Sequence, residues 1–196
     1  MIIGLTGGIA SGKTTASNFL KSLNIPIIDA DVIAREITQA NHPILLELAN
    51  TFGLSILNNG ELNRQKLRQI AFSSPEQLKK LNAITHPAIR TLIIERLKNT
   101  ITESYTVLSA PLLFENELHN LCDETWLIDV AEPIQLKRII RRDNSNVLSA
   151  QKIIDAQLDP KIKRDLADII IDNSKDINHL KQCILKQHHL TLEKIQ

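Results

Sequence analysis

One eight-residue segment, GGIASGKT at residues 7–14, constrains the fold of this chain more than any other feature. It follows an apolar stretch and precedes an amphipathic one, and it matches the pattern Gly-x4-Gly-Lys-Ser/Thr. In this pattern the backbone N–H groups surround phosphate oxygens, the lysine adds a positive charge and the last hydroxyl can bind Mg²⁺. We call residues 7–14 the phosphate loop. It predicts an ATP-binding protein in which Lys13 anchors the phosphates and Thr14 contacts the metal.

Short apolar runs recur along the chain and alternate with amphipathic stretches. They lie at residues 2–6, 25–28, 105–109, 125–130 and 167–171. Such runs are typical of parallel strands that are buried on both faces of a sheet, with ligands bound at the carboxyl ends of the strands. The sequence therefore predicts an α/β fold with a five-stranded parallel sheet.

Two insertions interrupt this alternation. About 75 residues separate the second and third runs, far more than one crossover helix requires. We expect helices there at residues 31–39, 43–52, 63–71, 75–84 and 87–102, with a turn at 58–60. The second insertion contains helices expected at 134–143 and 149–158, which form either a lid over the strand ends or an ordinary helical hairpin. The tail at 188–196 is expected to fray.

Composition excludes several classes of function. The net charge is +1, so no surface that binds polyanions is expected. Aromatic residues make up 3% of the chain, which leaves few stacking platforms for nucleic acid. No stretch is apolar enough for a membrane span. Cys122 and Cys183 lack metal-site spacing and are expected to be inert thiols. These features indicate a cytoplasmic protein, for which we expect a monomer, with no nucleic-acid or membrane partner.

Charged residues outside the loop indicate a kinase rather than a guanine-nucleotide switch, whose DxxG and N/T-K-x-D motifs do not occur in the sequence. Asp31 follows the second strand and is either a base that takes a proton from a hydroxyl acceptor or the cap of the next helix. Arg138 and Arg142 share a helix face, as lid cations or as a solvated surface. His86 opens an expected helix that carries Arg90, either to bind an acceptor phosphate or as a structural histidine.

Taken together, several segments resemble the dephospho-coenzyme A kinase family. They are GLTGGIASGKTT at 4–15, IIDADVIAREI at 27–37, LNRQKL at 62–67, ITHPAIR at 84–90, APLLFE at 110–115, QLKRIIRRD at 135–143 and ADIIIDN at 167–173. The resemblance implies transfer of the γ-phosphoryl group of ATP, with Mg²⁺, to the ribose 3′-hydroxyl of dephospho-CoA. It also implies a P-loop kinase core at 1–30, 103–137 and 166–196, a helical CoA domain at 31–102 and a lid at 138–165.

The resemblance also implies roles for individual residues. The catalytic candidates are Lys13, Asp31, Arg138 and Arg142. The ATP-binding candidates are Gly8, Ile9, Ala10, Ser11, Gly12, Lys13, Thr14, Thr15 and Asn173, with Thr14 as the metal ligand. The acceptor-site candidates are Thr6, Asp31, Arg35, Arg64, His86, Pro87, Arg90, Leu112, Leu113 and Glu115.

The sequence departs from the family pattern at two places. Position 10 is Ala where Gly is usual, which the loop accepts if the local φ is negative. Ser109 and Ala110 end the third strand where an acidic residue is often found, so a metal-binding carboxylate there is in doubt. The alternatives to this function are another small-molecule P-loop kinase and a non-catalytic, ATP-gated binding module.

Overall fold

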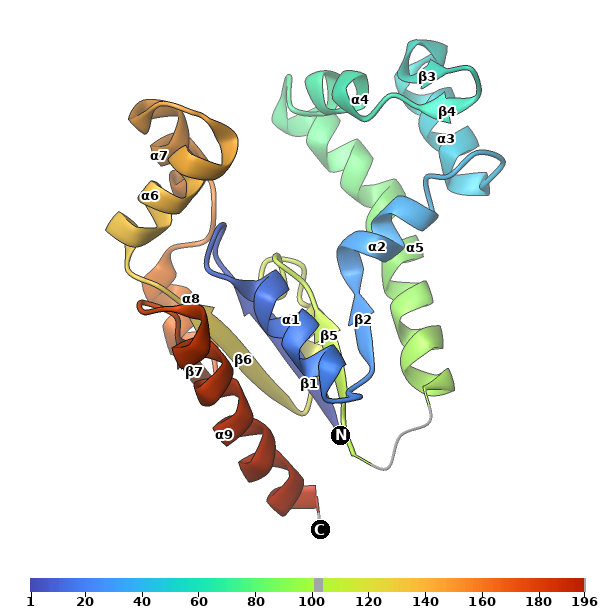
Figure 1. The fold of residues 1–196 in the computed structure, drawn as a ribbon. Helices are drawn as coiled ribbons and strands as arrows, with labels where there is room; N and C mark the ends of the chain where they lie inside the picture. Colours follow the sequence, from blue (N-terminus) through green and yellow to red (C-terminus); the bar gives the residue numbers. More distant parts are fainter. Residues whose placement is uncertain (101–103, 196) are drawn as a thin grey trace. The chain divides into compact units, whose positions relative to one another are not determined.

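The computed structural model describes residues 1–100 and 104–195, and the chain forms two compact units. The core unit comprises Met1–Ile28 and Thr100–Gln196, and the helical unit comprises Asp29–Asn99. Figure 1 shows both units, which we describe separately. The ends of the expected helix at 87–102 and of the expected tail at 188–196, together with the boundary between the CoA domain and the core at 102 and 103, lie outside the described residues.

A five-stranded sheet in the order β2-β5-β1-β6-β7 forms the centre of the core unit. The strands are β1 (Ile2–Gly7), β2 (Ile27–Asp29), β5 (Thr106–Ser109), β6 (Glu124–Asp129) and β7 (Ile169–Asp172). β1 pairs in parallel with both β5 and β6, and β6 pairs in parallel with β7. The predicted five-stranded parallel sheet is thus confirmed, with strand bounds that differ by one or two residues from those expected.

Side chains of one face of the sheet form the main core of this unit. Ile3, Leu5 and Trp126 are fully buried and pack with residues of α1 (Lys13–Ser22) and α9 (Ile177–Ile195). The two helices contact each other on this face (Figure 1). Because β1 has its carboxyl end at the start of α1, this packing fixes the phosphate loop at the edge of the sheet.

Three further helices of the core unit follow β6. They are α6 (Glu132–Asp143), α7 (Val147–Asp155) and α8 (Pro160–Leu166). Ile139, Ala150 and Ile154 form a small buried cluster between α6 and α7, and Ile9 and Ala10 of the phosphate loop pack against it. The second insertion is therefore helical, as predicted, and it touches the loop through apolar contacts.

The helical unit consists of four helices and a hairpin. Its elements are α2 (Ala30–Glu36), α3 (Pro43–Phe52), the short 3₁₀ helix η1 (Leu54–Ile56), β3 (Leu57–Asn58), β4 (Glu61–Leu62), α4 (Arg64–Ala71) and α5 (Pro75–Asn99). Leu48, Phe52, Ile56 and Leu67 form its buried cluster. β3 and β4 pair in antiparallel fashion around the predicted turn at 58–60.

Two expectations about helix ends are wrong. The helices expected at 75–84 and 87–102 are one helix, α5, with Pro87 inside it, so His86 does not open a helix. Proline costs a helix one hydrogen bond, but α5 packs against α2, α3 and α4, and this packing outweighs the local preference.

The tail is also ordered as far as it is described. α9 continues to Ile195, and His188 and Thr191 on its inner face are buried. The expected fraying therefore does not occur over the described part. It was expected because most residues of the tail are polar, and the buried face of the helix includes polar side chains. Among the described residues, no helix combines the length and apolar character needed to cross a membrane.

Candidate active site

A pocket of about 620 Å³ lies over the phosphate loop in the core unit. All eight loop residues and Thr15 line it. The remaining lining residues come from elsewhere in the same unit and are Pro111, Arg138, Arg142, Gln157, Asn173, Lys175, Ile177 and Leu180. The lining thus combines the phosphate loop with the cationic side chains of Arg138, Arg142 and Lys175, which suits a nucleoside triphosphate.

The backbone of the loop has the conformation that phosphate binding requires. The Ser11 N–H donates to the Gly8 carbonyl at 3.0 Å, which closes a tight turn. Gly12 has φ +101°, and a Cβ there would lie 2.2 Å from Nδ2 of Asn173. α1 begins at the next residue, so its unpaired N–H groups and positive dipole end face the loop.

Ala10 has φ +57°, so the condition under which the loop would accept Ala without strain, a negative φ, is not met. Ala10 is the third residue of the turn that the Ser11 N–H closes on the Gly8 carbonyl, the position that has a positive φ in a type II turn. An L-residue with a Cβ pays roughly 1–2 kcal/mol for this conformation. The loop therefore contains backbone strain at the position where the family usually has Gly.

Lys13 and Thr14 lie on different sides of the start of α1. Lys13 Nζ donates to Oγ of Ser109 at 2.8 Å, and Ser109 is fully buried at the end of β5. Thr14 is exposed and lines the pocket. Thr6 is buried below the loop, where its hydroxyl donates to the Pro111 carbonyl at 3.4 Å. Lys13 is thus oriented by a neutral hydroxyl and keeps its charge for a phosphate.

The two predicted lid arginines make different contacts. Arg138 donates to the Asn173 carbonyl at 2.9 Å and to the Ala10 carbonyl at 3.3 Å. Arg142 is exposed and forms two hydrogen bonds with the Asp143 carboxylate, which raise the pKa of Arg142 and lower that of Asp143. Both arginines line the same pocket as the loop.

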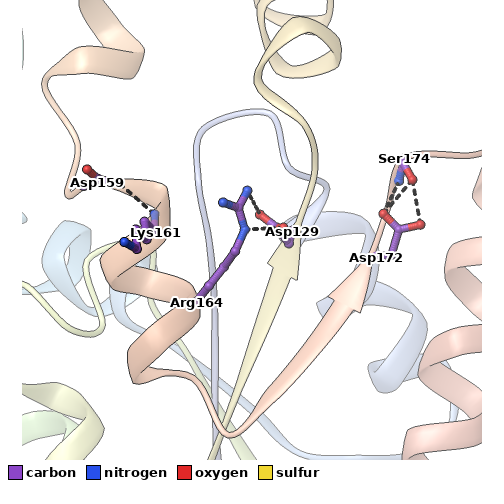
Figure 2. A network of polar contacts seen from close by, with 6 residues as sticks. All are labelled: Asp129, Asp159, Lys161, Arg164, Asp172 and Ser174. Atoms are coloured by element: carbon purple, nitrogen blue, oxygen red, sulfur yellow. Dashed lines mark hydrogen bonds and ion pairs between the residues drawn. The ribbon is translucent and has the colours of Figure 1, made fainter.

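An arginine of α8 holds the α6–α8 segment to the sheet. Figure 2 shows Arg164 directed at the carboxylate of Asp129, the last residue of β6. Its Nε and Nη2 donate to the two carboxylate oxygens at 2.8 and 3.2 Å. Asp159 caps α8 by accepting a hydrogen bond from the N–H of Lys161 (Figure 2). At the end of β7, the hydroxyl of Ser174 donates to the carboxylate of Asp172 (Figure 2). These contacts anchor the segments on either side of the pocket.

Glu115 makes an ion pair inside the core unit. Its Oε1 lies 2.9 Å from Nζ of Lys163, whose side chain is 3% exposed. Leu113 is fully buried on the face of the sheet opposite α1, whereas Leu112 is exposed. Of these three acceptor-site candidates, Leu112 is thus the most accessible, and the Glu115 carboxylate is already paired with a lysine of α8.

The other acceptor-site candidates lie in the helical unit. The side chain of Asp29 accepts hydrogen bonds from the N–H groups of Asp31 and Val32, so Asp29 is the N-cap of α2. The alternative in which Asp31 caps this helix is therefore wrong. Asp31 and Arg35 are both exposed on α2.

Arg64 lines two pockets of the helical unit, of about 490 and 250 Å³, together with Thr38 and Leu62. Its Nη2 donates to the Thr38 hydroxyl at 2.9 Å and to the Arg35 carbonyl at 3.4 Å. His86 and Arg90 lie one turn apart on α5, and burial lowers the pKa of His86. The helical unit thus has basic groups beside hollow surface, as an anionic ligand requires.

Three residues that the sequence did not single out contact the loop or its lysine. Ser109 accepts from Lys13, while Gln135 and Gln157 bond the backbone of Ile9. Neutral amide side chains carry no spacing signal of their own, so no pattern in the sequence pointed to the glutamines.

The residues at the loop fit a Mg²⁺ ion of the kind that accompanies nucleotides. Among residues 1–100 and 104–195, no group of three or more His, Cys, Asp or Glu side chains could hold a metal by itself. Mg²⁺ bound with a nucleotide keeps several waters and takes its other ligands from phosphates and one or two protein oxygens. The exposed hydroxyl of Thr14 on the pocket wall is such an oxygen.

Comparison with known proteins agrees with this geometry. The model of the family described as Dephospho-CoA kinase matches residues 1–179. A dephospho-CoA kinase of Acinetobacter baylyi is 45% identical over 188 residues, which are 95% of this chain and 96% of that protein. One of Carboxydothermus hydrogenoformans is 43% identical and covers 94% of this chain and 91% of its own length.

Solved structures show the same fold. A crystal structure of a Thermus thermophilus protein superposes with a TM-score of 0.86 at 30% identity and covers 98% of this chain and 97% of its own. Dephospho-CoA kinase from Campylobacter jejuni gives a TM-score of 0.75 at 29% identity, with 100% and 98% covered. A shikimate kinase from Bacteroides thetaiotaomicron, at 17% identity and a TM-score of 0.56, shares the fold.

Proposed function

The chain belongs to the dephospho-CoA kinase family, and from this premise we propose that it transfers the γ-phosphoryl group of ATP to the 3′-hydroxyl of dephospho-CoA. The products are ADP and coenzyme A, so the reaction is the last step of coenzyme A biosynthesis. The observation that carries the proposal is the pocket over the phosphate loop, in a chain that matches the family over 179 residues.

The donor half of the reaction belongs to the core unit. The loop N–H groups and the start of α1 bind the β- and γ-phosphates of ATP, and Lys13 neutralises the charge between them. Arg138 and Arg142 add positive charge on the same pocket, and Asn173 lies behind the loop with its side chain on the Ser11 carbonyl at 2.6 Å. Thr14 would hold Mg²⁺, which neutralises charge on the transferring phosphoryl group.

The charged groups proposed for the acceptor half, apart from Glu115, belong to the helical unit. Asp31 acts as the base that takes the proton of the 3′-hydroxyl, and it is exposed on α2, whose N-cap is Asp29. Arg35, Arg64 and Arg90 provide positive charge for the phosphates of dephospho-CoA. The remaining acceptor-site residues are Thr6, His86, Pro87, Leu112, Leu113 and Glu115.

The domain roles follow the same division. Residues 31–102 bind the CoA substrate, residues 138–165 act as a lid, and the remainder is the nucleotide-binding core. The protein works as a monomer in the cytoplasm. Its two free cysteines are suited to a reducing compartment, because burial raises the pKa of the Cys122 thiol to about 12 and keeps it unreactive.

An acceptor comparison tests the proposal. ADP release is measured with ATP and Mg²⁺ alone, with dephospho-CoA, and with coenzyme A, whose 3′-hydroxyl is already phosphorylated. Only dephospho-CoA should stimulate ADP release. No ADP release under any of the three conditions would indicate a non-catalytic, ATP-gated binding module, and equal release without acceptor would indicate hydrolysis of ATP. Stimulation by coenzyme A would indicate a different acceptor group.

A further inference from the structure

Two glutamines of the α6–α8 segment hold one residue of the phosphate loop from both sides. Nε2 of Gln135, on α6, donates to the Ile9 carbonyl at 2.6 Å. Oε1 of Gln157, between α7 and α8, accepts from the Ile9 N–H at 2.8 Å. Gln135 is buried, and it lies so close to the loop that a Cβ on Gly8 would come within 2.6 Å of its Nε2.

These bonds belong to a larger pattern along the loop. The carbonyl of Ile9 accepts from Gln135, that of Ala10 from Arg138, and that of Ser11 from Asn173. Three successive carbonyls are thus bonded by side chains from α6 and from the end of β7.

Because each peptide group is planar, the contacts of these carbonyls also determine where the N–H groups of the same peptides point. In a trans peptide the C=O and the following N–H point in opposite directions. With the Ile9 carbonyl bonded to Gln135, the Ala10 N–H points away from that side chain. In the same way Asn173 turns the Gly12 N–H away from itself. The Ile9 N–H donates to Gln157, so the Gly8 carbonyl of the same peptide points the other way. This carbonyl accepts a hydrogen bond from the Ser11 N–H at 3.0 Å.

We infer that Gln135 and Gln157 are positioning residues for the ATP phosphates, which act by fixing the two peptides of Ile9 so that the Ala10 N–H faces the nucleotide. The inference rests on the proposed function only in naming ATP as the ligand. It explains how the strained Ala10, next to the clamped residue, is held at φ +57°. Neither glutamine needs to touch the acceptor substrate.

The first test replaces each glutamine by methionine, which keeps the length of the side chain and removes the bond. Gln151→Met is the matched control, because Gln151 of α7 bonds Glu132 and Asp155 instead of the loop. The affinity for a non-hydrolysable ATP analogue with Mg²⁺ is measured by calorimetry, together with both KM values and the melting temperature. Calorimetry reports on the loop even if transfer to dephospho-CoA were to fail.

We expect Gln135→Met and Gln157→Met each to weaken analogue binding and raise the KM for ATP by about fivefold. The KM for dephospho-CoA and all values for Gln151→Met should stay close to wild type. Unchanged analogue affinity in both variants would overturn the inference, as would equal changes in both KM values that follow a lower melting temperature. If Gln135→Met does not fold, the Gln157 variant decides.

A pair of glutamate variants separates donor from acceptor. Gln157→Glu keeps an oxygen that accepts from the Ile9 N–H, whereas Gln135→Glu places a carboxylate oxygen against the Ile9 carbonyl. Both variants add a negative charge, but Gln157 lines the pocket and Gln135 does not, so charge alone predicts the larger loss for Gln157→Glu. We expect Gln135→Glu to bind the analogue at least about fivefold more weakly than Gln157→Glu. Equal affinities would contradict a role through these two bonds.

Discussion

Asp29 ends β2 and Asp31 lies in α2, so the two aspartates differ in structural position although only one residue lies between them. Asp29 accepts two backbone N–H groups of α2 and starts the helix. Asp31 is exposed in the first turn of α2, near the positive end of the helix dipole. The proposed base, Asp31, is therefore a different residue from Asp29, which caps the helix.

Replacing these aspartates by asparagine tests the division. Asp31→Asn should lower kcat by about 10²-fold or more, because the amide cannot take the proton of the 3′-hydroxyl. Asp29→Asn is the control, since asparagine caps a helix as well as aspartate, and it should retain most of the activity. Steady-state rates with saturating ATP decide. Similar rates for wild type and Asp31→Asn would remove Asp31 from the base role.

Ala10 shows how one side chain strains the loop. Its φ of +57° is a conformation that Gly adopts without penalty, while its methyl group packs beside the cluster between α6 and α7. This packing is favourable, but the methyl group disfavours the positive φ that the loop has at residue 10.

Ala10→Gly should therefore stabilise the protein, by about 0.5–1 kcal/mol, even though glycine raises the entropy of the unfolded chain. This corresponds to a rise in melting temperature of about 1–4 °C. The control is Ala83→Gly at an exposed position inside α5, which should destabilise by about 1 kcal/mol. Thermal unfolding of both variants checks the sign, and a loss of stability in Ala10→Gly would contradict the strain.

At the scale of elements, α9 docks onto the sheet through a polar contact inside an apolar interface. The Tyr105 hydroxyl lies 2.9 Å from Nδ1 of His188, and both residues are buried. Burial raises the pKa of Tyr105, so its hydroxyl stays protonated. Burial, and then the neighbouring His189, lower the pKa of His188 below 6.5. Protonation of His188 would thus oppose the docking of α9.

The docking of α9 should therefore weaken in acid. Below pH 6.5 the unfolded chain takes up a proton on His188 that the folded protein binds only at lower pH, so stability falls as pH falls. Urea unfolding of wild type and His188→Gln between pH 7.5 and 5 checks this, because the other histidines titrate in both proteins. The stability advantage of wild type should shrink toward low pH. A constant or growing advantage would contradict the lowered pKa.

The contact of α8 with the segment after β5 is a buried ion pair between Lys163 and Glu115. Lys163→Met should destabilise the protein by about 3 kcal/mol, because it leaves the Glu115 carboxylate without its counter-charge. Adding Glu115→Gln should restore most of this loss. Lys161→Met, at an exposed position of the same helix, is the control. Urea unfolding gives the free energies, and a double variant as unstable as Lys163→Met would show that the pairing is not what matters.

For the whole molecule, the sequence predicted what local patterns determine. The apolar runs predicted the sheet, and the spacing of Gly7, Gly12 and Lys13 predicted the loop and the start of α1. Predictions failed where packing overrides a local preference, as at Pro87 inside α5 and in the ordered tail of α9.

The candidate site divides in the same way. Arg138 and Arg142, which their charge and helical spacing had pointed out in the sequence, line the pocket over the loop. The φ of Ala10 depends on how the loop closes, and the contacts of Gln135 and Gln157 depend on where α6 and α7 lie. Such long-range contacts have no signature in a single sequence.

The central claim is that this chain phosphorylates dephospho-CoA, and the identity of the product tests it most directly. The purified protein is incubated with ATP, Mg²⁺ and dephospho-CoA, and the products are separated and examined by mass spectrometry and ³¹P NMR. The account predicts coenzyme A with its new phosphate on the ribose 3′-oxygen, and one ADP for each molecule formed. ADP without coenzyme A, or no product at high protein concentration, would contradict it.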